Sequence, residues 1–123
     1  MNYREFMLVF IGGGSGSLVR YSLSKLISNY YPFSFPLATL VINILASLVL
    51  GLFIGLTAKD LPNSNLKLLI AVGFCGGFST FSTFSNETLQ LFRSGQSNLA
   101  LLNIVLSLLL CIGVTYLGFL LTK

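Results

Sequence analysis

The residues best suited to hold an ion lie in one apolar stretch of the chain, at positions 73–85. This run contains the pair Gly76-Gly77, and five of the seven residues at 79–85 are Ser or Thr. Adjacent glycines favour an opening of the helix, because glycine is a poor helix former. A backbone opened inside a bilayer must be satisfied by protein, water or a bound ion, and broken membrane helices are where transporters hold ions. The run therefore predicts a site for a small solute inside a membrane.

Two phenylalanines in this run, Phe81 and Phe84, are three residues apart and would share one face of a helix. The edge of an aromatic ring is positive, so rings presented edge-on could stabilise a partly dehydrated anion, with Ser82 and Thr83 as hydroxyl donors. Apolar packing is the alternative for both rings. Opened backbone carbonyls near Gly76 to Ser79 would instead suit a cation.

A second polar pattern in the Leu-rich C-terminal stretch recurs at a spacing of four: Asn103, Ser107, Cys111 and Thr115. Residues four apart share a helix face, so the pattern predicts a hydrophilic stripe across about three turns. Ser and Thr also bond to the backbone of their own helix, and part of the stripe could then serve packing alone.

Three more polar residues lie inside apolar stretches, where polar groups are costly and are functional candidates by default. A charge at the depth of Arg20 costs ~2.5–3.5 kcal/mol, so Arg20 is interpreted as paired or functional, or as snorkelling to the helix end. Asn43 is interpreted as a helix–helix hydrogen bond or as part of a binding site. Glu87 could be a proton site or lie at the mouth of a pathway, and nearby Arg93 favours the mouth.

The elements that must position these residues are membrane-spanning helices. The chain has 123 residues, of which 54% are hydrophobic and 8% charged, and its mean hydropathy is +0.89. A spanning helix needs about 20 apolar residues, and four stretches qualify: 6–27, 36–58, 66–92 and 99–121. We predict one all-α domain over residues 1–123. The first stretch is interpreted as a spanning helix and not a signal peptide, because no cleavage site is clear.

Charge and cysteine content argue against several other functions. The basic residues stand singly at the ends of the apolar stretches, as membrane anchors do, so the net charge of +4 does not indicate a nucleic-acid partner. Their bias to one side of the membrane is weak, which suits insertion in both orientations or reflects the small number of charges. With no His and no paired carboxylates, no enzyme is predicted. Cys75 and Cys111 are expected to form neither a zinc site nor a disulfide.

Small residues at a spacing of four indicate close helix packing. Gly12-xxx-Gly16 lies in the first stretch and Gly51-xxx-Gly55 in the second, and such faces let membrane helices approach closely. Four helices packed ~8–10 Å apart enclose no wide pore. Together with the short chain, these faces predict an oligomer.

Taken in order along the chain, the motifs resemble the Fluc (CrcB-type) fluoride channels. The resemblance rests on GGGSGSLVRY at 12–21, on Asn43 with Gly51, and on GFCGGFSTFSTFS at 73–85, and it covers the whole chain. It implies four transmembrane helices, the third broken mid-membrane, in an antiparallel dual-topology homodimer within the lipid of the bacterial cytoplasmic (inner) membrane. The implied function is passive, selective export of fluoride through two pathways per dimer, which protects the cell from fluoride toxicity.

The resemblance also implies roles for single residues of the third stretch. Phe81 and Phe84 match the aromatic pair that stands edge-on to fluoride, Asn43 matches the vestibule asparagine beside it, and Ser82 and Thr83 match hydroxyls near the pathway.

A structural sodium ion at the two-fold axis is also implied, held by the backbone carbonyls of Gly76 and Ser79 from both subunits. Ser79 replaces the usual Thr there, but a carbonyl ligand does not depend on the side chain. Arg20 matches the arginine of the first-helix motif, and Glu87 matches a vestibule glutamate.

The stripe of the last stretch resembles the polar track of the family's fourth helix. Ser107 and Thr115 match it, and Thr115 fits best. A Tyr is common where Asn103 stands and a hydroxyl where Cys111 stands, so the track departs from the family at two positions.

Two other classes of protein share part of this pattern. Small proton-coupled multidrug exporters also form antiparallel four-helix dimers, but they need a membrane-embedded carboxylate, normally in the first helix. This chain has Arg20 there and only Glu5 at the tip. A small assembly subunit would explain the glycines, but not the Gly-Gly pair with its phenylalanines and hydroxyls. The fluoride channel is therefore the favoured interpretation.

Overall fold

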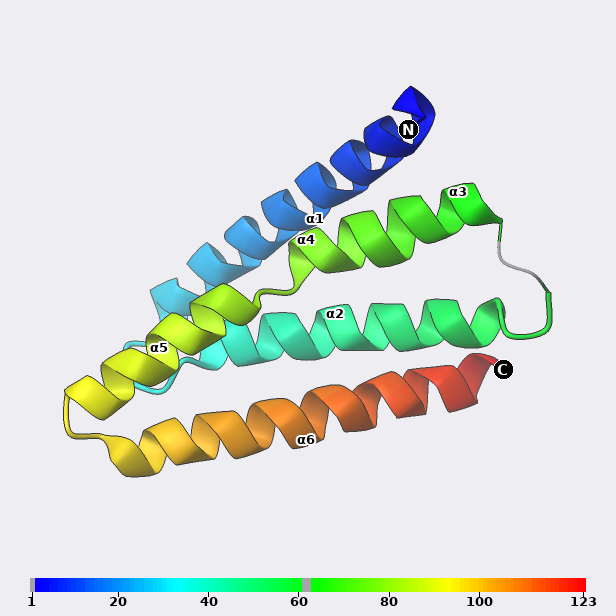
Figure 1. Cartoon of the computed structure of the whole chain (residues 1–123). Helices are drawn as coiled ribbons and strands as arrows, with labels where there is room; N and C mark the ends of the chain where they lie inside the picture. The colour runs from blue at the N-terminus through cyan, green and yellow to red at the C-terminus, as the bar shows by residue number, and fades with distance from the viewer. Residues whose placement is uncertain (1, 61–62) are drawn as a thin grey trace.

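The computed structural model describes residues 2–60 and 63–123, and all regular structure within them is helical, as predicted. The elements follow one another as α1 (Tyr3–Tyr30), α2 (Leu37–Leu56), α3 (Ser64–Leu66), η1 (Lys67–Cys75), α4 (Gly76–Phe78), α5 (Phe81–Arg93) and α6 (Ser97–Thr122) (Figure 1). The segment η1 has the wider π-helical winding, and α3, η1 and α4 form one continuous rod.

Four helical spans are long and apolar enough to cross a membrane: Tyr3–Tyr30, Leu37–Leu56, Ser64–Arg93 and Ser97–Thr122. The four stretches predicted from the sequence agree with these spans to within a few residues at each end. The shortest span, α2, is about 30 Å long at 1.5 Å per residue, which matches the hydrocarbon core of a bilayer. Pro36 lies immediately before α2, where it removes no helical hydrogen bond.

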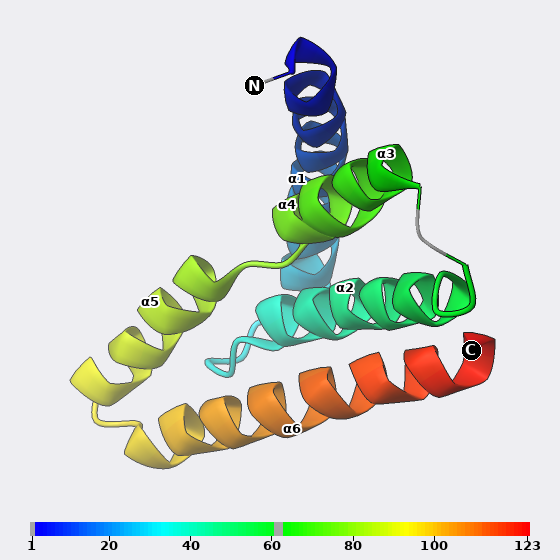
Figure 2. The same cartoon turned by 45° about the vertical axis from the view of Figure 1, so that its right-hand side comes forward.

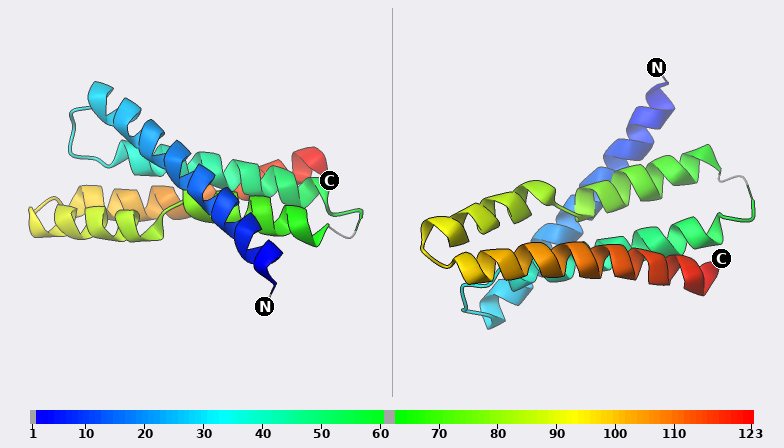
Figure 3. Two further views of the ribbon diagram at one scale, coloured as in Figure 1. Left: turned by 90° about the horizontal axis from the view of Figure 1, so that it is seen from above. Right: turned by 60° about the horizontal axis from the view of Figure 1, so that its bottom comes forward.

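The spans pack mainly as two pairs, and α2 also contacts α1 and η1 of the other pair. Helices α2 and α6 lie side by side along their length, while α1 crosses η1 and α4 at an angle (Figures 1 and 3). Figure 2 shows α1 inclined steeply away from α2 and α6. Both termini lie at one end of the bundle, and the loops that follow α1 and α5 lie at the other (Figure 1).

The third span is not helical at Ser79 and Thr80, where the backbone is extended with ψ angles of 156° and 110°. The sequence predicted an opening that begins at Gly76-Gly77 and reaches Ser79. Its start is wrong, because both glycines lie in α4 and the helix opens only at Ser79. Position 77 requires glycine for a different reason, because a Cβ there would meet the Gly13 carbonyl of α1. The helix resumes at Phe81 because the Thr80 hydroxyl caps α5, accepting a hydrogen bond from the Thr83 N–H at 3.2 Å.

Glycines determine how closely the spans approach one another. A Cβ at Gly16 would meet the Phe74 carbonyl, and one at Gly51 would meet the Thr115 carbonyl. We call the contact of α1 with η1 and α4 the glycine seam; its members are Gly12, Gly16, Gly73 and Gly77. Both predicted small-xxx-small faces are therefore used within one chain, and they do not by themselves indicate an oligomer.

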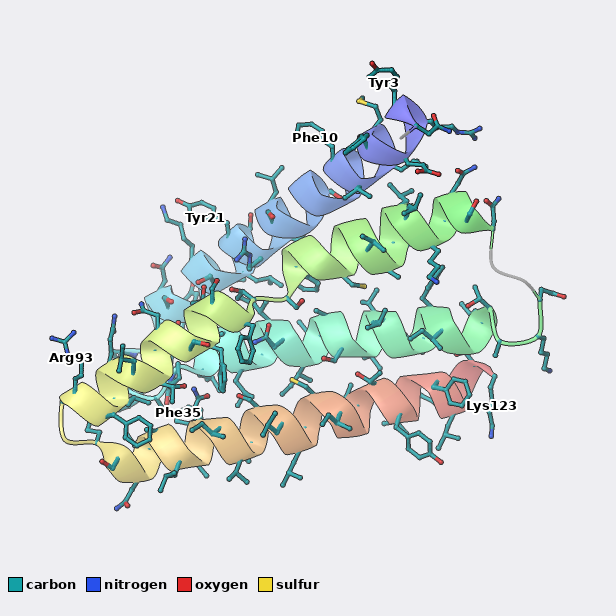
Figure 4. All side chains as sticks on the ribbon, in the orientation of Figure 1. Tyr3, Phe10, Tyr21, Phe35, Arg93 and Lys123 are labelled. Carbon is teal, nitrogen blue, oxygen red and sulfur yellow. The ribbon has the colours of Figure 1, made fainter. Side chains whose placement is uncertain are left out.

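The core of a single chain is small and its surface is apolar. Ile42, Ala46 and Phe78 form the buried cluster, with Leu23 and Phe74 packed against it. Large apolar side chains point outward from all four spans (Figure 4). A surface of this kind suits lipid or a partner chain and not water.

Candidate functional site

Asn43 ties α2 to the two extended residues of the third span. The Thr80 N–H donates to Asn43 Oδ1 at 2.8 Å, and Asn43 Nδ2 donates to the Thr80 carbonyl at 3.3 Å. Thr80 is buried, so these two bonds satisfy backbone groups that would otherwise be costly to leave unpaired. The Asn43 amide keeps one N–H that is not used in this pairing.

Next to this tie is a cavity of about 230 Å³, which we call the aromatic cavity. Its lining comes from α2, the extended residues, α5 and α6: Asn43, Ser47, Ser79, Thr80, Phe81, Phe84, Ser107, Leu108 and Cys111. The rings of Phe81 and Phe84 stand 5.4 Å apart between centroids and are tilted by 42°. The structure therefore brings together predicted residues from three separate stretches of the sequence.

The polar stripe of α6 is divided between different surroundings. Asn103 is only 1% exposed; it donates to the Thr88 hydroxyl at 3.0 Å and accepts from the Ser107 hydroxyl at 3.3 Å. Ser107 and Cys111 line the aromatic cavity. Thr115 donates to the Cys111 carbonyl of its own helix at 2.8 Å and lines a separate apolar cavity. Within one chain, the structure does not bring Thr115 to the aromatic cavity.

Arg20 lines a neighbouring cavity of about 260 Å³. Five hydroxyl residues share it: Tyr21, Ser24, Thr39, Thr80 and Thr83. Within residues 2–60 and 63–123, no acidic side chain pairs with Arg20, so its charge faces the hydroxyls of this cavity. Ser82 is exposed; its hydroxyl oxygen lies 3.4 Å from that of Thr80, and it lines neither cavity.

Glu87 lies in a third cavity, of about 400 Å³, at the end of the bundle where α1 and α5 finish. The Thr39 hydroxyl donates to Glu87 Oε1 at 2.8 Å. Oε2 is buried and makes no hydrogen bond to the described residues. The lining is rich in hydroxyls and amides, including Ser24, Gln90 and Ser94, so it is suited to water.

These cavities form a row in which neighbours share lining residues. Ser24 lines both the Glu87 and the Arg20 cavities, and Thr80 lines both the Arg20 and the aromatic cavities. Ser47 and Ser79 connect the aromatic cavity to a fourth, of about 170 Å³. The cavities thus adjoin one another, with the Arg20 cavity between the Glu87 and the aromatic cavities.

Comparison with known proteins places this arrangement in a family. The profile described as "CrcB-like protein, Camphor Resistance (CrcB)" matches residues 7–119. The chain belongs to the CrcB-like family. It is 48% identical to the fluoride-specific ion channel FluC of Pyrococcus furiosus over 124 aligned residues, which cover all of this chain and 99% of the relative. It is 40% identical to the FluC channel of Gloeothece citriformis, with 97% of both chains covered.

A third relative, the FluC channel of Phocaeicola vulgatus, is 45% identical over 92 residues, which cover 75% of this chain and 76% of the relative. These relatives are named as ion channels and not as enzymes, in line with the prediction from composition. With four helices able to span a bilayer, this CrcB-like chain is a multi-pass membrane protein.

In this CrcB-like chain, the interruption of the third span also frees backbone carbonyls. In an unbroken helix the Thr80 N–H would bond to the Gly76 carbonyl, but here it bonds to Asn43. Gly76 and Ser79 both line the fourth cavity, beside Cys75. The Ser79 hydroxyl donates to the Cys75 carbonyl at 2.9 Å and is directed back into its own helix.

Three site residues of the CrcB-like chain were missed from the sequence: Thr39, Ser47 and Thr88. Thr39, Asn43 and Ser47 recur at a spacing of four on α2, which is the same signal that revealed the stripe on α6. Thr88 follows Phe84 by four residues and donates to its carbonyl at 2.7 Å. The periodicity of both helices was available in the sequence.

Proposed function

We propose that this chain forms a fluoride-selective channel that passively conducts fluoride across a membrane. The observation that carries the proposal is the aromatic cavity, where both phenylalanines, Asn43 and Ser107 meet. A passive pathway must bind the ion well enough to admit it and weakly enough to release it. Amide and hydroxyl donors with positive ring edges provide this balance, whereas a full positive charge would hold fluoride too tightly.

The row of cavities supports an order of events along the pathway. Fluoride enters the cavity beside Glu87, and the Arg20 charge raises the local concentration of anions. It then exchanges water for the donors near Asn43 and passes the edges of Phe81 and Phe84. Ser107 lies beside the rings on α6, whereas Thr115 takes no part in this order.

A second copy of the chain is needed to complete the site. Phe81 is 76% exposed and Gly76 is also exposed in the single chain, so the aromatic and carbonyl groups face outward without cover. We propose an antiparallel homodimer with two pathways, in which the interruption at Ser79 and Thr80 lies near the middle of the bilayer. Its position near the centre of the Ser64–Arg93 span supports that depth.

We further propose a structural sodium ion at the two-fold axis, held by the Gly76 and Ser79 carbonyls of both subunits. The Gly76 carbonyl fits this role because its usual helical donor is engaged by Asn43. When bound, the ion supplies positive charge that offsets the dipoles of the opened backbone. The residues of this chain contribute by keeping Thr80 extended, which leaves the Gly76 carbonyl without its helical N–H donor.

The expected location is the bacterial cytoplasmic (inner) membrane, with lipid covering the outward apolar side chains. There the channel would release fluoride that enters the cell as the neutral acid, and so protect against fluoride toxicity. Names of the relatives support the choice of ion.

The decisive experiment is fluoride efflux from liposomes that contain the purified protein, followed with a fluoride electrode and with chloride as the control ion. We expect rapid loss of fluoride and no loss of chloride. A folded, dimeric preparation that releases no fluoride with sodium present throughout would overturn the proposal.

A further inference from the structure

The hydrogen bonds within the aromatic cavity show which of its donors are free to meet an anion. Four hydroxyl residues line this cavity: Ser47, Ser79, Thr80 and Ser107. A hydroxyl has one hydrogen to donate. Each hydroxyl that already donates to a protein acceptor is therefore unable to donate to fluoride unless that bond breaks.

Three of these four hydroxyls are already engaged as donors. Ser79 donates to the Cys75 carbonyl at 2.9 Å, and Thr80 donates to the Thr83 hydroxyl at 3.0 Å. Ser107 donates to Asn103 Oδ1 at 3.3 Å. What remains of each hydroxyl is its capacity to accept, which an anion does not need.

Ser47 is different from these three. Among the residues that the structure describes, its hydroxyl donates to no oxygen atom; its partner is the Cys111 thiol on α6, and the residue is half-buried. It stands one turn after Asn43 on α2, so the two side chains share a helix face. It also lines both the aromatic cavity and the fourth cavity beside Gly76.

The remaining polar side chains of the cavity do not replace this donor. Cys111 is hydrogen-bonded to Ser47, but a thiol is a weak donor and its sulfur a weak acceptor, so the Ser47 hydroxyl can exchange this partner for an anion more readily than the hydroxyls bonded to oxygen can. Asn43 has committed its oxygen and one N–H to Thr80, which leaves a single N–H. The strong donors left for an anion are thus one amide N–H and one hydroxyl, both on the same face of α2.

We propose that the Ser47 hydroxyl is a direct donor to fluoride in the aromatic cavity and a determinant of conduction. This inference rests on the proposed function. Fluoride that loses water between the phenylalanines must regain hydrogen bonds, because an unpaired charge in an apolar environment is very costly. The Asn43 N–H and the Ser47 O–H would hold the ion from one side while the ring edges face it from the other.

The test measures fluoride efflux from liposomes containing the wild-type chain, Ser47→Ala or Ser22→Ala. A hydrogen bond to a charged group is worth enough that we expect Ser47→Ala to lower the efflux rate by about tenfold or more. Ser22→Ala is the matched control, because Ser22 donates to the Leu18 carbonyl on an exposed face of α1. It should conduct at the wild-type rate.

A second pair, Ser47→Thr and Ser47→Val, separates the hydroxyl from the space it occupies, since Thr and Val differ only by hydroxyl and methyl. The Thr variant should keep most of the fluoride efflux and the Val variant should lose it. If the Ser47→Ala variant does not fold, the comparison of Thr with Val still tests whether the Ser47 hydroxyl is needed for fluoride efflux.

Equal rates for Thr and Val, or a wild-type rate for Ser47→Ala, would show that the Ser47 hydroxyl is not a donor to the ion. Absence of fluoride efflux from the wild-type chain would instead overturn the proposed function itself. The two failures are therefore distinguishable.

Discussion

The glycine seam and the aromatic cavity join the helices in opposite ways, the first through glycines and the second through polar and aromatic side chains. In the seam, α1 meets η1 and α4 so closely that a Cβ at Gly12 would meet the Leu69 carbonyl. Around the aromatic cavity, the helices are held apart by side chains, and amide and hydroxyl groups bridge them. Close backbone contact leaves no room for an ion, whereas side-chain bridges leave a cavity of about 230 Å³. Rigid packing on one side thus supports an open, polar site on the other.

The largest effect is expected in the glycine seam. Gly16→Val would place a side chain against the Phe74 carbonyl. The backbone of η1 cannot move aside unless the two helices separate. Overpacking costs about 1–3 kcal/mol or more, so we expect no folded protein on size-exclusion chromatography in detergent. Gly14→Val is the control, since a Cβ at Gly14 has nothing within 4 Å; failure of both variants alike would contradict the role given to the seam.

The next effect concerns the aromatic cavity alone. Phe81→Ile keeps apolar bulk but removes the positive ring edge, so fluoride efflux should fall by about tenfold or more, a loss of ~1.4 kcal/mol or more in the barrier. The protein should remain folded, because Phe81 is largely exposed in the chain. Phe10→Ile, at an exposed position on α1, provides the comparison. An efflux rate equal to that of Phe10→Ile would show that the ring edge of Phe81 does not contribute to fluoride conduction.

A mixed effect is expected at Asn43, which both supports the backbone and faces the ion. Asn43→Ala leaves the Thr80 N–H and carbonyl without partners, which should lower the free energy of unfolding by about 1–3 kcal/mol. Asn43→Asp keeps the acceptor for the Thr80 N–H but adds a negative charge that repels fluoride. Thermal unfolding should therefore be more sensitive to Ala, and fluoride efflux more sensitive to Asp. The reverse order would contradict this division of roles.

The smallest effect is expected at Thr115. Its hydroxyl is satisfied by its own helix and lines a cavity away from the phenylalanines. Thr115→Val should change fluoride efflux by less than about twofold, because it removes no interaction with the ion and conserves volume. Ser107→Ala, on the same face of α6, should reduce it more, because it removes the hydrogen bond that holds Asn103 and alters the wall of the aromatic cavity. If Thr115→Val had the larger effect, the pathway would have to continue past the aromatic cavity along α6.

Some parts of the site could be predicted and others could not. The pairing of Phe81 with Phe84 and the stripe on α6 follow from helix periodicity, which depends only on the spacing of residues. The partner of Asn43 could not be found in this way, because Asn43 and Thr80 are 37 residues apart. The same limit explains the error at Gly76-Gly77: low helix propensity favoured an opening, but close packing against Gly13 explains why glycine is needed there.

The sequence by itself determined the all-α class, the four spans and the set of polar residues near the middle of the third, because apolar length and periodicity are local properties of the chain. Tertiary structure decided where the third helix is interrupted, since the Asn43 amide satisfies the backbone of Thr80 and not that of the glycines. It also decided that the Ser47 hydroxyl meets only the weak thiol acceptor of Cys111, whereas the hydroxyls beside it donate to oxygen atoms. Hydrogen-bond satisfaction depends on which segments meet, and only the folded chain brings those segments together.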